Sequence, residues 1–126
     1  MDRFLRWFAM TWGGALVAIC LLHAFGGAST NFGMGEFTAS ADNQVRYFAV
    51  VGLVYAVAYI WLGREQVTPR VPALFLGAVT LASGLIRVLS ILVYGLPHPF
   101  WLVMMPLEWV AGLLTLLMAY RAARPA

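Results

Sequence analysis

The sequence predicts an all-α integral membrane protein: a four-helix up-down bundle with both termini in the cytoplasm. Three observations support this fold class, namely the composition, four long apolar stretches and the placement of the arginines. The chain has 126 residues, of which 63% are apolar and 10% are charged, whereas a soluble domain carries about 25% charged residues. We therefore expect a single transmembrane domain over residues 1–126, with no separate soluble module.

Four stretches reach the roughly 20 apolar residues that a helix needs to cross a bilayer core. They comprise residues 7–25, 45–63, 71–94 and 100–121. The segments between them are rich in Gly, Ser, Thr and Asn (residues 26–44), in charged residues (64–70), or in Gly and Pro (95–99), which favours turns. Ser40 and Asp42 are candidate N-caps of the second helix. The first stretch is long enough to span, so we expect an uncleaved helix and not a signal peptide.

The arginines orient the predicted bundle. All eight basic residues are arginines, and six of them fall on one side of the membrane if the spans alternate. By the positive-inside rule that side is cytoplasmic. The opposite side carries Glu36, Asp42 and, of the arginines, only Arg46. The six cytoplasmic arginines are Arg3, Arg6, Arg64, Arg70, Arg121 and Arg124.

Two further sequence features bound the function. The arginines sit mostly at the ends of the segments and form no basic run, so nucleic acid is not an expected partner. Cys20 is the single cysteine, which excludes an intrachain disulfide, and within an apolar run it is expected to pack as a small hydrophobic side chain.

Arg87 and Glu108 are the residues that most need an explanation, because both fall inside predicted spans. An ionisable group at membrane depth costs roughly 2.5–3.5 kcal/mol. With about 1.5 Å of rise per residue, Arg87 lies about 10 Å and Glu108 about 12 Å below the outer surface. Opposite charges at one depth predict an Arg–carboxylate ion pair. Such a pair can fix helix register, or it can serve a ligand or catalysis, and the sequence leaves both readings open.

Other polar residues fall in the same outer half, and Ser90 lies one turn beyond Arg87 on its helix face. The inner halves carry few strong polar side chains, so we expect a polar cavity that opens outward and is closed inward by apolar packing. Structural roles compete for these residues: an interfacial hydrogen bond for His23, snorkelling for Arg46 and a cap or loop position for Asn43. The candidate ligand-binding residues are Arg87, Glu108, Arg46, His23, Asn43 and Ser90.

The first connection, residues 26–44, is long for a helical bundle. Connections of this length are often lids or binding segments. Phe32, Met34 and Phe37 lie among its glycines, where they can cover the outer cavity or enter the interface. A flexible linker is the alternative.

Several of these residues also carry a family resemblance. The chain resembles the bacterial family of small four-helix membrane proteins called domain of unknown function 4345, and distantly the DoxX-like proteins. The resemblance implies a multi-pass protein of the bacterial cytoplasmic membrane, and the family name implies no activity. DoxX-like relatives include subunits associated with quinone-linked redox complexes, which implies a quinone as one candidate ligand. The residues concerned are His23, Asn43-x-x-Arg46-Tyr47, Ser83-Gly84-x-x-Arg87-x-x-Ser90, Gly95-x-Pro97 and Glu108.

Three functions follow from these observations. The first is a binding or accessory protein whose outer pocket holds an amphiphile such as a lipid or quinone, or docks a partner subunit or a second copy. Arg87 and Arg46 would then bind the head group, while Glu108 holds Arg87 in place. The second is a small membrane enzyme, in which Glu108 and His23 are the catalytic candidates for proton transfer or quinone-linked redox chemistry. The third is a transport component with the ion pair as a proton-coupled gate.

The motif content ranks the binding protein first. The sequence has no Cys/His metal cluster, no G-x-S-x-G nucleophile motif and no phosphate loop, so no metal site is predicted. Haem is disfavoured as a cofactor because His98 lies in a loop and both histidines fall toward one surface. Four helices without a visible inverted repeat are few for a transporter. Whether the protein is an enzyme stays open from the sequence.

Overall fold

The structure, a computed structural model, describes residues 2–122, which form four long α-helices and one short 3-10 helix. Every one of the four α-helices is long and apolar enough to cross a membrane. The predicted all-α class is therefore confirmed, while Arg124 lies outside the described residues. The elements are α1 (Arg3–Gly26), η1 (Gly27–Thr30), α2 (Ala39–Arg64), α3 (Arg70–Tyr94) and α4 (Pro99–Ala122).

The helices extend beyond the predicted spans because local capping lengthens them. The Asp2 carboxylate accepts a hydrogen bond from the Phe4 amide at 2.9 Å and starts α1. The N-cap of α2 is Thr38, whose hydroxyl accepts from the Ala41 amide at 3.2 Å. Ser40 and Asp42 were the expected caps, and that prediction is wrong. As a result α2 begins at Ala39, and the unstructured part of the first connection shrinks to residues 31–38.

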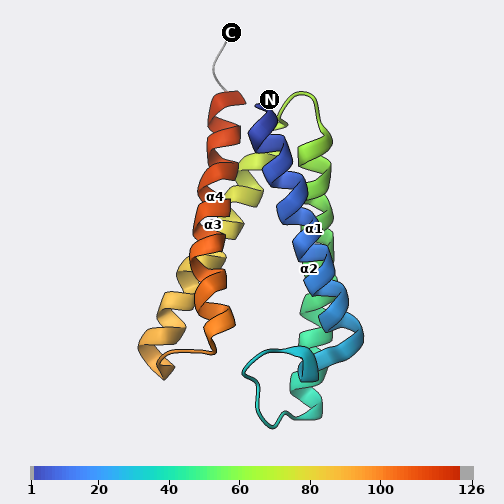
Figure 1. Ribbon diagram of the computed structural model, residues 1–126, viewed down its shortest axis with the longest axis vertical. Helices are drawn as coiled ribbons and strands as arrows, with labels where there is room; N and C mark the ends of the chain where they lie inside the picture. Colours follow the sequence, from blue (N-terminus) through green and yellow to red (C-terminus); the bar gives the residue numbers. More distant parts are fainter. Residues whose placement is uncertain (1, 123–126) are drawn as a thin grey trace.

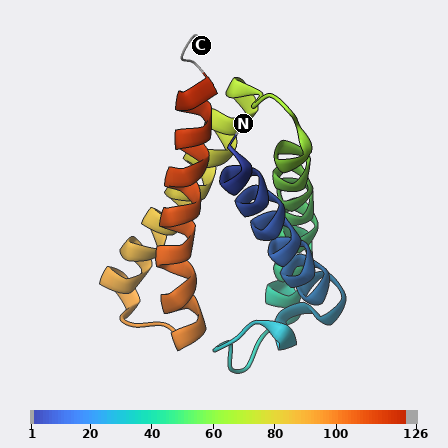
Figure 2. The same cartoon turned by 45° about the horizontal axis from the view of Figure 1, so that its top comes forward.

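The four α-helices pack chiefly as two antiparallel pairs, α1 with α2 and α3 with α4. The start of α1, the end of α4 and the loop of residues 65–69 lie together at one end, which we call the termini end (Figure 1). The other end carries η1, residues 31–38 and the turn of residues 95–98, and we call it the η1 end. In both ribbon views the two pairs are close at the termini end and diverge toward the η1 end (Figures 1 and 2).

Glycines allow the close approach within each helix pair. A Cβ added at Gly13 would lie 2.8 Å from the carbonyl oxygen of Ala56, so α1 and α2 nearly touch there. In the other pair, a Cβ at Gly112 would lie 2.7 Å from the amide nitrogen of Leu81. Small residues at such positions let helix backbones approach in lipid. Gly63 and Gly77 make comparably close backbone contacts in the two pairs.

The hydrophobic core lies at the termini end and receives residues from all four long helices. Tyr59 and Leu62 of α2 are fully buried in it. Since the largest shared core sits at this end, it holds the two helix pairs together and leaves their opposite ends free to separate. The other members are Leu5, Ala9, Ala73, Leu76, Met118 and Ala119.

A cluster of hydroxyl groups joins the helix pairs beside this core. The Tyr59 hydroxyl lies 2.7 Å from the Thr80 hydroxyl of α3 and 3.0 Å from the Thr115 hydroxyl of α4. Tyr55 makes a second hydrogen bond to Thr80. Both threonines also donate to the carbonyl oxygen one turn earlier in their own helices. The inner half is thus closed by the apolar core, as expected, and in addition by this hydroxyl cluster, whose buried polar groups satisfy one another.

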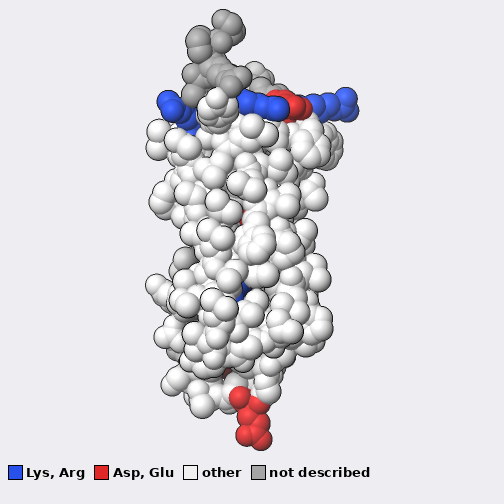
Figure 3. All heavy atoms as spheres, turned by 90° about the vertical axis from the view of Figure 1, so that its left-hand side faces the viewer, with Lys and Arg blue, Asp and Glu red and all other residues white. Residues whose placement is uncertain are grey.

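The outer surface suits a membrane. Large apolar side chains such as Val54, Phe75 and Leu92 are exposed on it, as expected where lipid is the solvent. In the view of Figure 3, basic side chains gather at the termini end with an acidic group among them, and acidic atoms project from the η1 end. Arg6 of α1 donates to the Gly63 carbonyl at 3.2 Å at the termini end.

We expect Gly112→Ala to destabilise the fold by about 1–3 kcal/mol, because the new methyl group meets the Leu81 backbone, which cannot move aside. Gly14→Ala is the matched control, since a Cβ there meets nothing within 4 Å. It should stabilise the fold by up to about 1 kcal/mol, because alanine is favoured over glycine inside a helix. Thermal unfolding in detergent, followed by circular dichroism, measures both. Equal stabilities of the two variants would contradict the close contact.

We expect Tyr59→Phe to cost about 1–2 kcal/mol, because the hydroxyl that joins α2 to α3 and α4 is lost inside a buried cluster. Tyr47→Phe is the control. Tyr47 is 61% exposed, so its loss should change the unfolding free energy by about 0.5 kcal/mol or less. A Tyr59→Phe variant as stable as the wild type would show that the hydroxyl cluster does not hold the helix pairs together.

Candidate functional site

Arg87 of α3 and Glu108 of α4 face each other in a two-point contact. Arg87 Nε lies 2.8 Å from Glu108 Oε2, and Nη2 lies 2.7 Å from Oε1. Gly84, one turn before Arg87, allows α4 to approach, since a Cβ there would lie 3.2 Å from the Glu108 Cβ. The two side chains are 33% and 10% exposed. Both carboxylate oxygens of Glu108 therefore accept hydrogen bonds from Arg87, while one face of the Arg87 guanidinium is left uncovered by Glu108.

Trp101 packs against that open face. The guanidinium carbon of Arg87 lies 5.2 Å from the centroid of the Trp101 ring, within the range of a cation–π contact. The sequence analysis missed this contact of Trp101 with Arg87. The spacing of Trp101 and Glu108, seven residues apart on one helix, was the available signal because such residues share a face.

A cleft of about 540 Å³ lies beside this group at the η1 end. We call it the Arg87 cleft. Arg87 and Ser90 of α3 line one wall, and Trp101 of α4 lines another. The cleft thus combines a few polar groups with a mainly apolar lining, as ligand sites usually do. Its remaining residues are Asn31, Phe32, Gly33, Met34, Ile91, Pro97, His98 and Met105.

The first connection covers this cleft. The Phe32 ring stacks on His98 at 6.0 Å and lies 4.7 Å from the Phe100 ring. Trp101 Nε1 donates to the Phe32 carbonyl oxygen at 2.6 Å. This arrangement corresponds to the lid alternative, with Phe32 and Met34 over the cleft and Phe37 exposed. The same contacts are the link between the two helix pairs at the η1 end.

A second cleft, of about 480 Å³, lies against α1 and α2 and is mainly apolar. We call it the Cys20 cleft. Asn31, Met34 and Trp101 line both clefts, so the two are neighbours across the covering segment. Its other lining residues are Cys20, His23, Ala41, Gln44, Val45, Phe48 and Ala49.

His23 lines the Cys20 cleft and does not line the Arg87 cleft. Its Nδ1 lies 2.8 Å from the Thr30 hydroxyl, which itself donates to the Gly27 carbonyl at 2.7 Å. Because the threonine proton is used, Nδ1 carries the hydrogen and donates to Thr30. Glu108 and His23, the catalytic candidates, thus belong to different groups of contacts.

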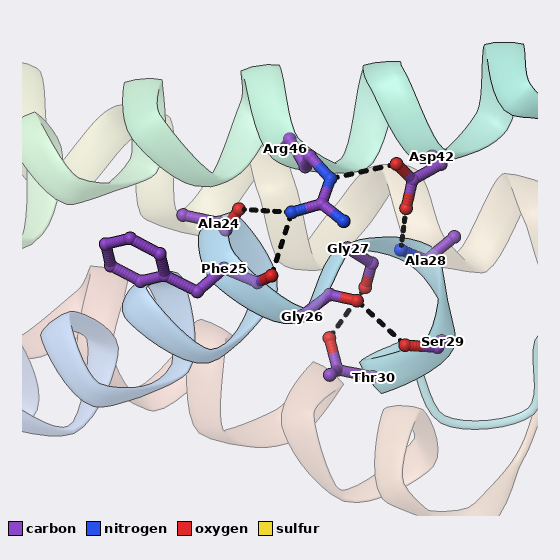
Figure 4. Close-up of polar contacts among 9 residues, drawn as sticks. All are labelled: Ala24, Phe25, Gly26, Gly27, Ala28, Ser29, Thr30, Asp42 and Arg46. Atoms are coloured by element: carbon purple, nitrogen blue, oxygen red, sulfur yellow. Dashed lines mark hydrogen bonds and ion pairs between the residues drawn. The ribbon is translucent and has the colours of Figure 1, made fainter.

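Arg46 lies apart from Arg87 and closes the end of α1 instead (Figure 4). Its Nη1 donates to the carbonyl oxygens of Ala24 at 3.0 Å and Phe25 at 2.8 Å. Asp42 holds it, with 2.8 Å from Arg46 Nε to the carboxylate, and also accepts from the Ala28 amide at 2.9 Å. Arg46 thus satisfies carbonyl groups that a helix end leaves without partners.

The structure therefore brings together only part of the predicted set. Arg87 and Ser90 line the Arg87 cleft with Glu108 behind Arg87. His23 lines the neighbouring cleft. Arg46 and Asn43 line neither, and Asn43 is exposed on α2. Sequence spacing placed all of these residues toward the same ends of their helices but could not give the direction in which each side chain points.

Comparison with protein families matches residues 4–119 to the family described as a domain of unknown function, DUF4345. The chain belongs to this family. The matched range runs from the start of α1 nearly to the end of α4, so the DUF4345 protein is a small membrane protein with four apolar helices. No curated protein and no solved structure gives a match, and the distant likeness to DoxX-like proteins has no support.

We expect Arg87→Met to destabilise the protein by about 3 kcal/mol or more, because it leaves the buried Glu108 carboxylate unpaired. Glu108→Leu should cost less, since Arg87 is a third exposed. The joint Arg87→Met, Glu108→Leu variant should recover most of the loss. Thermal unfolding of the four proteins gives the coupling energy. Strictly additive losses would show that the pair contributes no mutual stabilisation.

Proposed function

We propose that this DUF4345 protein is a small binding or accessory protein that holds the head group of an amphiphile in the Arg87 cleft. The observation that carries the proposal is the position of Arg87. Its guanidinium is fixed by Glu108 on one side, faces Trp101 on another and borders a cleft with a largely apolar lining. Such a site fits a molecule with a polar end and an apolar body, such as a lipid or a quinone.

The hydrogen-bonding capacity of Arg87 supports this function. A guanidinium has five N–H donors, and Glu108 accepts from two of its nitrogens. Among the described residues, no other acceptor is within hydrogen-bonding distance of the group. Unsatisfied donors are costly away from bulk water, so an acceptor oxygen in the cleft would stabilise the arrangement. Ester carbonyls, quinone carbonyls and hydroxyl groups all supply one.

The charge distribution supports an outward-facing site. Five of the described arginines, at positions 3, 6, 64, 70 and 121, belong to the termini end, and that end is cytoplasmic by the positive-inside rule. The η1 end then faces outward in a bacterial cytoplasmic membrane. In that orientation the Arg87 cleft lies in the outer leaflet, within reach of lipids and quinones that diffuse in the bilayer.

The contacts favour binding over the proton-transfer alternative. A catalytic pair would need Glu108 and His23 to share one reaction space. Glu108 has both oxygens bound by Arg87, while His23 uses Nδ1 for Thr30 and lines the other cleft. Glu108 and His23 therefore do not face one shared cleft in which both could act on a substrate.

Native mass spectrometry of protein extracted in mild detergent tests the proposal. The wild type should carry an added mass of one amphiphile, and the joint Arg87→Met, Glu108→Leu variant should stay folded and lose it. Arg46→Met is the matched control, because Arg46 is also a paired arginine at the η1 end but lines neither cleft. It should retain the added mass.

Three outcomes would overturn the proposal. The wild type could appear without any bound amphiphile in several mild detergents. The joint variant could retain the ligand in full. A second protein or a second copy could be retained in place of a small molecule, in which case the cleft docks a subunit.

A further inference from the structure

The Arg87 cleft and the Cys20 cleft differ in chemistry although they share a wall. Asn31, Met34 and Trp101 belong to both. The Arg87 cleft is lined by Arg87, with Glu108 behind it, and borders α3 and α4. The Cys20 cleft is lined by apolar side chains of α1 and α2, including Val45, for most of its surface. A cleft with one charged side chain in its lining therefore lies beside a cleft that has none among the described residues.

The charge balance of the pair restricts the head group. Glu108 already neutralises Arg87 through two hydrogen bonds, and Arg87 is the only arginine that lines the cleft among the described residues. An anionic head group would leave one negative charge in excess beside the Glu108 carboxylate, whose side chain is 10% exposed, and an uncompensated charge next to a buried one is costly. A neutral oxygen acceptor uses the free guanidinium donors at no such cost.

His98 adds a donor to the same cleft. Its Nδ1 accepts a hydrogen bond from the Phe100 amide at 3.2 Å, so in the neutral ring the proton resides on Nε2. Arg87 and His98 both line the Arg87 cleft, so each can offer an N–H donor to a molecule that binds there. Because Glu108 neutralises the charge of Arg87, these N–H donors favour uncharged acceptor oxygens such as carbonyls.

We propose that the two clefts form one site for an uncharged, carbonyl-bearing amphiphile with a single long chain. The head group lies in the Arg87 cleft, and the chain passes Trp101 into the Cys20 cleft. This proposal rests on the proposed function and adds the charge of the head group and the path of the chain. Because Phe32 covers the η1 end, the ligand reaches the site from the bilayer, between the helix pairs.

The first test measures charge selectivity in detergent by native mass spectrometry. The probes are monoolein, which is neutral, and oleoyl lysophosphatidate, which is anionic and has the same chain. The wild type should bind monoolein about tenfold more tightly. Glu108→Gln leaves Arg87 uncompensated and should reverse the preference. Equal binding of both probes by the wild type, or no change on Glu108→Gln in a folded variant, would refute the neutral head group.

The second test locates the chain. Val45→Trp places an indole in the Cys20 cleft and should weaken monoolein binding about tenfold. Val51→Trp on the same helix is the matched control, since Val51 is exposed and lines neither cleft, and binding should change less than about twofold. A monoolein analogue with a diazirine near its chain end should crosslink to Val45 or Ala49 in the wild type.

The outcomes separate this inference from the function on which it rests. If Val45→Trp binds monoolein as the wild type does, but Arg87→Met with Glu108→Leu abolishes binding, then the head-group site stands and the chain path is wrong. If neither variant reduces binding, the proposed function fails as well. A quinone with one isoprenoid chain, tested in the same way, distinguishes a quinone from a neutral lipid as the source of the carbonyl.

Discussion

The buried hydroxyl of Tyr59 is the contact on which the rest of the structure depends. It joins α2 to Thr80 of α3 and Thr115 of α4, inside the region where all four long helices contribute to one core. Lipid offers no hydrophobic force to bring helices together, so close packing and hydrogen bonds between helices must do so. Within each pair, glycines provide the packing. Between the pairs, this hydroxyl cluster and the core beside it provide the connection.

A connection at one end has a consequence at the other. Two helix pairs joined at the termini end diverge toward the η1 end (Figure 1), and the Arg87 and Cys20 clefts lie at that end. The contacts that link the pairs there are of a different kind, because Phe32 reaches from the first connection to His98 and Trp101. Few apolar contacts and a hydrogen bond at the surface make a link that opens more readily than a core does. Separation of the helix pairs at the η1 end is therefore the motion that would open the proposed path from the bilayer without unfolding the protein.

The fold was predictable from composition, because four apolar stretches leave few alternatives in a membrane. The contact partners of the site residues were harder to predict from the sequence. The depth of Arg87 and Glu108 follows from helical rise, and the structure places their side chains in contact. Depth alone also grouped Arg46 with them, yet Arg46 turns toward the end of α1. Helical rise gives the position of a residue along the helix axis. The direction of its side chain depends on which helices pair, and the pairing depends on glycine contacts between segments far apart in the sequence. The hydroxyl cluster was missed because single threonines in apolar helices carry no pattern.

The placement of the Arg87–Glu108 pair argues for a role beyond holding the helices in register. Both residues belong to the α3–α4 pair, so their contact adds nothing to the connection between the two pairs. The register of α3 and α4 is already set by the backbone approach at Gly112 and by the short turn that follows Tyr94. A pair of charges at membrane depth is costly to insert, and apolar side chains could pack the same helices without that cost. What apolar residues could not provide is a guanidinium that is fixed at the edge of a cleft with its remaining donors unused, and the proposed head-group site depends on that property.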